Sequence, residues 1–196
     1  MFADAVVKNI RDVVALTNVE VSNILSVLEE KTFRRKEFVL TAGDVCRYQT
    51  YVVSGCLRIF YANQSGEEYN VKFAIENWWA FDLESFAIQS PAFYSIQALE
   101  DSQCFQISKS NHDWLCEHVP ATEKFTRMIY QNSYIMLQHR LTQNLYQTGE
   151  DKYEAFVSKY PGLELRISQK EIASYLGITP EFLSMLRRKR VKNPIS

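Results

Sequence analysis

The chain has 196 residues, of which 46% are hydrophobic and 13% aromatic, so it can bury a core and is not a disordered chain. Its 22 basic and 23 acidic residues nearly cancel and give a net charge of −1. No apolar run approaches the roughly 20 residues of a membrane helix, and the first residues do not resemble a secretory signal. We therefore expect a cytoplasmic protein that has no membrane as a partner.

The spacing of cysteines and histidines argues against a metal centre and against catalysis. No C-x-x-C pair occurs, and the four cysteines stand far apart in the chain. A metalloenzyme built on a small barrel needs histidines in its strands, and residues 33–107 contain none. No catalytic triad or nucleotide-binding fingerprint is present either. We predict no metal site, no cofactor and no catalytic residue, and we expect reduced, mostly buried thiols at Cys46, Cys56, Cys104 and Cys116.

The first half of the chain predicts two short helices followed by a set of short strands. Apolar residues recur at helical spacing over residues 4–31, with a break at Asn18. Over residues 33–107 the pattern alternates instead, and turn sequences at 41–44, 54–55 and 63–66 divide it into strand candidates, the first at 33–40. Short strands at this regular spacing predict a small antiparallel roll or barrel.

A long helix is predicted from Pro120 to about Gln147, and it carries two apolar stripes. One stripe consists of Tyr130, Tyr134, Leu137, Leu141 and Leu145. The other follows a near-heptad rhythm through Phe125, Ile129, Asn132, Met136, His139, Gln143 and Tyr146. A polar Asn132 inside a heptad seam is a device that fixes register and dimer state, so we place a homodimer seam at Phe125, Ile129, Asn132, Met136 and His139. The alternative is that this second stripe packs against the rest of its own chain.

The C-terminal segment reads SQKEIASYLGITPEFLSMLRRK from Ser168 to Lys189. Ser168 followed by Glu171 is a capping box, which predicts a helix beginning at Gln169. Gly177 ends that helix, and Thr179 with Pro180 begins a second one. A helix, a glycine turn and a helix form the helix-turn-helix pattern that places its second helix in the major groove of DNA. A plain helical hairpin inside a larger fold is the alternative.

Charge supports the DNA-binding interpretation. Residues 164–196 hold seven basic and three acidic side chains, a net charge of +4, which leaves −5 for the rest of the chain. The predicted DNA-binding residues are Ser168, Gln169, Thr179, Pro180, Glu181, Ser184, Arg187, Arg188, Lys189 and Arg190. Those at the start of the second helix would meet bases, with Glu181 accepting from a cytosine amino group, and the basic run would contact phosphates.

From about Phe33 to Lys189 the chain resembles the Crp/Fnr superfamily of bacterial transcription regulators. The resemblance is carried by Tyr51–Arg58, by Asp151–Tyr153 through Lys159–Pro161, and most strongly by Glu171–Glu181. It implies an α+β protein with a cyclic-nucleotide-binding-type β-roll, a long dimerisation helix and a C-terminal helix-turn-helix. It further implies a homodimer that regulates transcription on double-stranded DNA, with RNA polymerase as a further candidate partner.

One stretch departs from the cyclic-AMP-binding members of that family. Their phosphate cassette contains a Gly-Glu pair and an Arg that neutralises the cyclic phosphate. Here Phe81 and Asp82 stand at the pair, and Tyr94 followed by Ser95 stands where the Arg is expected. No Lys or Arg occurs between Trp78 and Gln103, so a response to cyclic AMP is not expected. Phe81, Asp82, Tyr94 and Ser95 remain a candidate pocket for an unknown small-molecule effector, although aromatic side chains in this region more often fill a roll interior.

We therefore expect a roll domain at 1–119, a dimerisation helix at 120–148 and a DNA-binding domain at 149–196. The competing function is a β-roll module that binds a small ligand or a protein and does not bind DNA. The residues leave open the effector, the operator and the sign of regulation. They also leave open whether the head has a wing, with residues 164–167 as the candidate wing strand.

Overall fold

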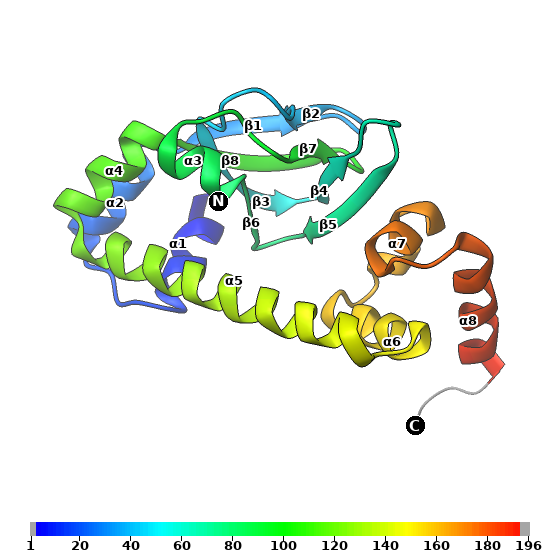
Figure 1. Cartoon of the computed structure of the whole chain (residues 1–196). Helices are drawn as coiled ribbons and strands as arrows, with labels where there is room; N and C mark the ends of the chain where they lie inside the picture. The colour runs from blue at the N-terminus through cyan, green and yellow to red at the C-terminus, as the bar shows by residue number, and fades with distance from the viewer. Residues whose placement is uncertain (1–2, 193–196) are drawn as a thin grey trace.

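The computed structural model describes residues 3–192 and places a β-roll, a long helix and a helical head in sequence along the chain (Figure 1). Two short helices come first, α1 (Ala3–Arg11) and α2 (Asn18–Ser26). The side chain of Thr17 caps α2 and forms a capping box with Glu20. Both helices pack beside the roll, so the prediction of two short helices is confirmed, but the break precedes Asn18 and residues 29–31 belong to the first strand of the roll.

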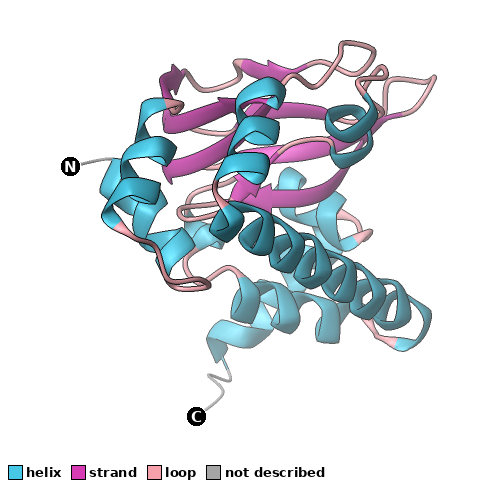
Figure 2. Ribbon diagram, turned by 90° about the vertical axis from the view of Figure 1, so that its left-hand side faces the viewer, coloured by secondary structure: helices cyan, strands magenta, loops and turns pink. Residues whose placement is uncertain are grey.

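The roll consists of two four-stranded antiparallel sheets, as the alternating pattern predicts. One sheet has the order β1 (Glu29–Phe33), β8 (Ser102–Ser108), β3 (Tyr48–Ser54) and β6 (Trp79–Ala80). The other has the order β2 (Phe38–Leu40), β7 (Ser95–Ala98), β4 (Leu57–Ala62) and β5 (Glu68–Ala74). Figure 2 shows these strands gathered at the top of the molecule, with helices on the side toward the C-terminus.

The single strand predicted at 33–40 is wrong, because the chain turns in the middle of it. Lys36 adopts a φ of 72°, and β1 and β2 on either side join different sheets. The hairpin between β4 and β5 is as predicted. Asn63 Oδ1 accepts from the amides of Ser65 and Glu67, and Gly66 supplies the positive φ that the turn requires.

Helices make up the remainder of the chain. They are α3 (Leu83–Ile88), α4 (Lys109–His118), α5 (Pro120–Tyr146), α6 (Gly149–Lys159), the 3-10 turn η1 (Leu163–Leu165), α7 (Gln169–Leu176) and α8 (Pro180–Lys192). The candidate wing strand at 164–167 overlaps η1, so it is not a strand, and the described part of the head contains none. Within residues 3–192, no helix combines the length and apolar content that crossing a bilayer requires.

Three apolar cores hold these elements together. One joins α1, α2, α4 and the start of α5 to the roll, and a second fills the space between the two sheets. The third is the core of the head, and it also includes Cys56 and Phe73 from the roll. Because roll and head share this core, the head lies against β5 rather than at the end of a free linker.

The two apolar stripes of α5 face different surroundings. In the predicted seam, Phe125 is 6% exposed and packs with Ile129 against the roll. Asn132, Met136 and His139 are exposed, and the last two also line a cavity between α5 and the head. The opposite stripe is open to solvent, with Tyr134, Leu137, Leu141 and Leu145 all exposed. Phe125 and Ile129 of the predicted seam thus pack against their own chain, whereas its other three residues and the opposite stripe from Tyr134 onward are open to solvent.

Candidate nucleic-acid interface

The helix-turn-helix consists of α7, a three-residue turn and α8. Ser168 caps α7, its side chain accepting from the amide of Glu171. Gly177 ends α7 in the left-handed conformation with φ 68°, and its amide donates to the carbonyls of Ala173 and Ser174. Thr179 Oγ1 then accepts from the amide of Phe182 in the first turn of α8. The predicted helix boundaries are therefore correct.

Helix α8 buries one face and leaves the other in solvent. Leu183 and Leu186 are buried in the head core, so α8 is held against α6 and α7 and not against the roll. Glu181, Met185 and Arg188 are exposed, and their spacing of four and three residues places them on one face. Met185 is the member of this face that the sequence prediction missed, although its spacing from Glu181 and Arg188 was the signal that could have found it.

The other predicted contact residues lie around that face. Ser168, Gln169, Thr179, Pro180 and Lys189 are exposed, whereas Ser184, Arg187 and Arg190 are partly buried. Two of the four successive cations are already paired inside the head. Lys189 Nζ lies 2.7 Å from a Glu150 carboxylate oxygen, and Arg190 lies 3.4 Å from Glu164. Sequence counting therefore overstates the free positive charge, and Arg188 is the exposed cation of the run that forms no ion pair within the described residues.

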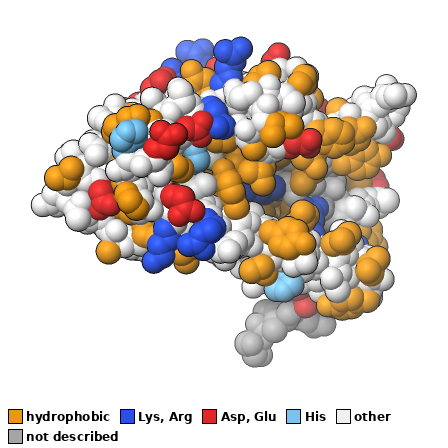
Figure 3. Space-filling view, turned by 60° about the vertical axis from the view of Figure 1, so that its left-hand side comes forward, with side chains coloured by type: hydrophobic (Ala, Val, Ile, Leu, Met, Phe, Trp, Pro, Cys, Tyr) orange, Lys and Arg blue, Asp and Glu red, His pale blue; other side chains and the backbone are white. Residues whose placement is uncertain are grey.

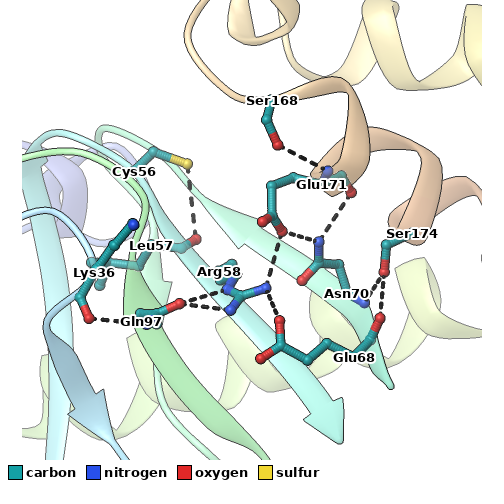
Figure 4. Close-up of polar contacts among 10 residues, drawn as sticks. All are labelled: Lys36, Cys56, Leu57, Arg58, Glu68, Asn70, Gln97, Ser168, Glu171 and Ser174. Atoms are coloured by element: carbon teal, nitrogen blue, oxygen red, sulfur yellow. Dashed lines mark hydrogen bonds and ion pairs between the residues drawn. The ribbon is translucent and has the colours of Figure 1, made fainter. Parts of the chain in front are cut away.

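Glu171 does not complete the capping box that the sequence predicts. Its amide donates to Ser168, but its carboxylate turns to the roll and binds Arg58 of β4 at 3.1 Å (Figure 4). Asn70 of β5 donates from its side chain to Glu171 Oε2 at 2.6 Å and to the Glu171 carbonyl at 3.0 Å. The carboxylate is drawn away from its helix because a buried cation and a buried amide offer it stronger partners.

Arg58 is the centre of this contact, and it is only 6% exposed. Its guanidinium binds Glu68 at 2.7 Å, donates twice to Gln97 Oε1 and lies 4.0 Å from the ring centroid of Phe60. Ser174 joins from α7, accepting from the amide of Asn70 and donating to the carbonyl of Glu68. We call Arg58, Glu68, Asn70, Glu171 and Ser174 the latch, since they fasten the first helix of the motif to the roll.

Two further arginines connect head and roll. Arg166, just before α7, binds the carboxylates of Glu76 and Glu100, and donates to the carbonyl of Gly55. These hydrogen bonds raise the pKa of Arg166 above its ordinary value, so its charge is permanent. Arg140 of α5 donates to the carbonyls of Val71 in β5 and Tyr175 in α7. The motif is thus held by the roll and by the long helix together.

Lys72 lies beside this interface and has no carboxylate partner among the residues that the structure describes. Its Nζ donates to the carbonyl of Trp79 at 3.2 Å and lies 5.6 Å from the ring centroid of Trp78. Burial, together with the charge of Lys159, lowers the pKa of Lys72 to about 8. The unfolded chain keeps this proton to a higher pH, so the charged Lys72 destabilises the folded state below about pH 8. The loss of stability disappears as the pH rises toward 10.5, where the lysine is also neutral in the unfolded chain.

Replacing Lys72 by methionine is therefore expected to raise the melting temperature at pH 7, by about 2–6 °C. The advantage over the unmodified protein should shrink between pH 8 and pH 10, because the native lysine loses its charge there. Melting curves at four pH values measure this difference, and Lys124→Met, at an exposed site on α5, is the control. A gain that is equal at all pH values would show that packing, and not charge, is responsible.

Asp82 of the candidate effector pocket has a different role from the one considered from sequence. It is 3% exposed, and its Oδ1 accepts from the backbone amide of Ser85 at 3.0 Å. This hydrogen bond caps the start of α3. Its Oδ2 accepts from the amides of Phe93 and Tyr94 at 3.0 and 3.1 Å. One carboxylate therefore joins the start of α3 to the segment before β7.

Asp82→Ala would leave three backbone amides without this acceptor, and we expect it to lower the free energy of unfolding by about 3 kcal/mol. Asp82→Asn keeps one acceptor oxygen and should cost less than alanine. Urea denaturation of the two variants tests the order. Equal losses would contradict a role for the carboxylate as an acceptor of several amides.

The remaining residues of the candidate pocket pack against neighbouring side chains and backbone. Phe81 packs against Phe86 and Tyr130, and Tyr94 packs against Phe93. Ser95 is buried and accepts from the amide of Ala42. Within the described residues, no group of three or more His, Cys, Asp or Glu side chains is arranged to hold a metal ion.

Comparison with known proteins identifies the fold of this chain. Residues 30–119 match the family model of the cyclic nucleotide-binding domain, and no curated protein matches the chain. The structure of FixK2 from Bradyrhizobium japonicum superposes with a TM-score of 0.73 at 17% identity, covering 86% of this chain and 87% of that one. A protein of Eubacterium rectale described as a transcriptional regulator of the Crp/Fnr family gives 0.68 at 16% identity, with coverage of 90% and 84%. The chain has the Crp/Fnr fold.

Other proteins of this fold match over similar lengths. The catabolite activator protein of Thermus thermophilus gives a TM-score of 0.60 at 16% identity and covers 94% of this chain and 87% of its own. The matched domain ends at Val119, where α5 begins, so in this Crp/Fnr fold the long helix and the head lie outside the domain model.

Proposed function

We propose that the protein is a homodimeric, sequence-specific DNA-binding transcription regulator that does not respond to cyclic AMP. The observation that carries the proposal is the exposed face of α8, presented by a capped helix-turn-helix of the Crp/Fnr fold. Glu181 and Ser184 would meet base edges, with Thr179 and Pro180 at the entry of the helix into the groove. Arg188, and Arg187 beside it, would contact phosphates.

The proposal is tested by the affinity of the full chain for a random-sequence duplex. Cationic contacts release counterions, so the logarithm of the binding constant should fall linearly with the logarithm of salt concentration. Fluorescence anisotropy at several ionic strengths measures the slope. If no duplex binds even at low salt, the alternative holds, in which the roll and head form a module for a small ligand or a protein.

The exposed stripe of α5 supports a homodimer. Tyr134, Leu137, Leu141 and Leu145 lie at spacings of three and four residues, and Leu145 is 82% exposed. Figure 3 shows hydrophobic side chains at several places on one face of the molecule. A row of leucines in water is costly, and a second copy of the same helix would cover it in a symmetric contact.

Leu141→Glu places a charge in the middle of that stripe and is expected to convert the dimer to a monomer at micromolar concentration. Asn132→Glu, at an exposed position of the other stripe, is the matched control and should leave the dimer intact. Analytical ultracentrifugation distinguishes the two species. A dimer that survives Leu141→Glu and dissociates with Asn132→Glu would restore the seam predicted from sequence.

The proposed insensitivity to cyclic AMP rests on Asp82. Its buried carboxylate already binds the amides of Phe93 and Tyr94, so a cyclic phosphate would meet a negative charge instead of free donors. Tyr94 stands where the family resemblance expects an Arg, and residues 79–102 contain neither Lys nor Arg. Cyclic AMP at about 1 mM is therefore expected to leave the melting temperature unchanged, and a rise would contradict this part of the proposal.

A further inference from the structure

A cavity of about 280 Å³ lies where α5, α6 and α7 meet, on the side of α5 that faces its own chain. Its walls include Trp78 from the roll, Arg140 from α5, Lys152 and Lys159 from α6, and Tyr175 from α7. This cavity is separate from the exposed stripe of α5, from the outer face of α8 and from the surroundings of Asp82. The functions proposed above make no use of it.

The charge around the cavity has one sign. No acidic residue lines it, and within the described residues none of Lys72, Lys152 and Lys159 forms an ion pair. Three other cations of the head, namely Arg166, Lys189 and Arg190, each bind a carboxylate. Lysines that are partly buried and unpaired repel one another, and Lys159 is close enough to Lys72 to influence its ionisation.

Aromatic rings make up much of the rest of the wall. The ammonium groups of Lys72 and Lys159 lie 5.6 and 5.7 Å from the centroid of the same Trp78 ring. The Cζ atom of Arg140 lies 4.2 Å from the centroid of the Tyr175 ring, and Phe156 contributes a further aromatic ring to the wall. Flat apolar walls beside unpaired cations are the features that bind a small molecule with a planar body and an acidic group.

We infer that this cavity binds a small aromatic anion, a phosphate or a carboxylate. Its acidic group pairs with Lys159 and Lys152, which lie two turns apart on one side of α6, and its ring packs among Trp78, Phe156 and Tyr175. The volume admits a single ring system and its acidic group. Because the walls come from α5, α6 and α7, the bound molecule joins the long helix to the head.

Phenyl phosphate is a suitable probe, with inorganic phosphate for the charge alone and phenol for the ring alone. Isothermal titration of the full chain, without DNA, should show phenyl phosphate binding at least tenfold more tightly than either. Lys159→Gln should weaken this binding at least fivefold, and Lys152→Gln provides a second variant if the first does not fold. Lys124→Gln removes the same charge from an exposed site on α5 and should change nothing.

Absence of phenyl phosphate binding at millimolar concentration would overturn the inference. So would an unchanged affinity in a correctly folded Lys159→Gln protein, or equal binding of inorganic phosphate. The measurement uses no DNA, so a failure here leaves the proposed regulator function intact. Conversely, a protein that binds the probe and no duplex would lose that function and keep this site.

Discussion

Replacing Arg58 by methionine is expected to lower the free energy of unfolding by about 3–5 kcal/mol. The guanidinium is 6% exposed and binds two carboxylates, Glu68 and Glu171. Methionine keeps most of the side-chain volume but leaves the carboxylates of Glu68 and Glu171 without their counterion. Stability is therefore lost through uncompensated charge, which a change in packing alone would not produce.

The loss of stability should be distributed unevenly along the chain, because the latch joins the head to the roll. We expect amides of α7 and α8 to exchange hydrogen faster in Arg58→Met, while those in β3 and β8 remain protected. Arg35→Met is the matched control, since the Arg35 side chain is exposed and forms no ion pair within residues 3–192. Hydrogen exchange read by mass spectrometry, with urea denaturation, gives both quantities. Uniform loss of protection across the roll would show that Arg58 supports the roll and does not fasten the head.

A double-mutant cycle separates the ion pair from the rest of the latch. Glu171→Gln keeps the shape of the side chain and its contact with Asn70, but it removes the charge that Arg58 binds. We expect a coupling energy between the two positions of about 1–3 kcal/mol. Additive losses would mean that Glu68 alone balances Arg58 and that Glu171 contributes only to packing.

Arg188→Ala is expected to weaken duplex binding by about 5- to 150-fold, which corresponds to 1–3 kcal/mol, and to reduce the salt dependence by about one charge. Arg188 is exposed on the same face of α8 as Glu181. Arg190 lies two residues further along and is turned to Glu164, 3.4 Å away. Arg190→Ala removes the same charge from the same helix and should change affinity by less than about threefold.

Anisotropy titrations with one duplex at two salt concentrations compare the three proteins, and circular dichroism confirms that each variant is folded. The contrast between Arg188 and Arg190 distinguishes a groove-facing surface from simple attraction by a basic segment. If both variants lose affinity equally, binding depends on total charge. If only Arg190→Ala loses affinity, α8 presents the opposite face to DNA.

Local sequence signals predicted the elements of the head with good accuracy. Ser168, Gly177 and Thr179 act on backbone groups within a few residues of themselves, so their meaning does not depend on the rest of the fold. The alternation over residues 33–107 likewise predicts an antiparallel roll, because a two-residue period is a property of the strand itself. The long helix follows from an uninterrupted stretch after Pro120.

Partners that lie far away in the chain were beyond sequence reasoning. Glu171 has the right spacing to cap its own helix. Its carboxylate instead binds Arg58, which lies 113 residues before it in the chain. The sequence predicts that Lys189 and Arg190 are free cations, but in the folded chain they form ion pairs with Glu150 and Glu164. Arg58 itself gives one weak signal, a charge within the apolar strand LRIFYA.

Local patterns in the sequence were sufficient to predict the roll, the long helix and the two helices of the motif with their boundaries. The three-dimensional contacts were needed to show that the head is fastened to the roll, that the leucines of α5 are exposed, and that Asp82 accepts from three backbone amides. Periodicity states that a helix has two faces but not which neighbour covers each one. That choice depends on contacts between residues distant in the chain, whose energies are settled only when the elements pack.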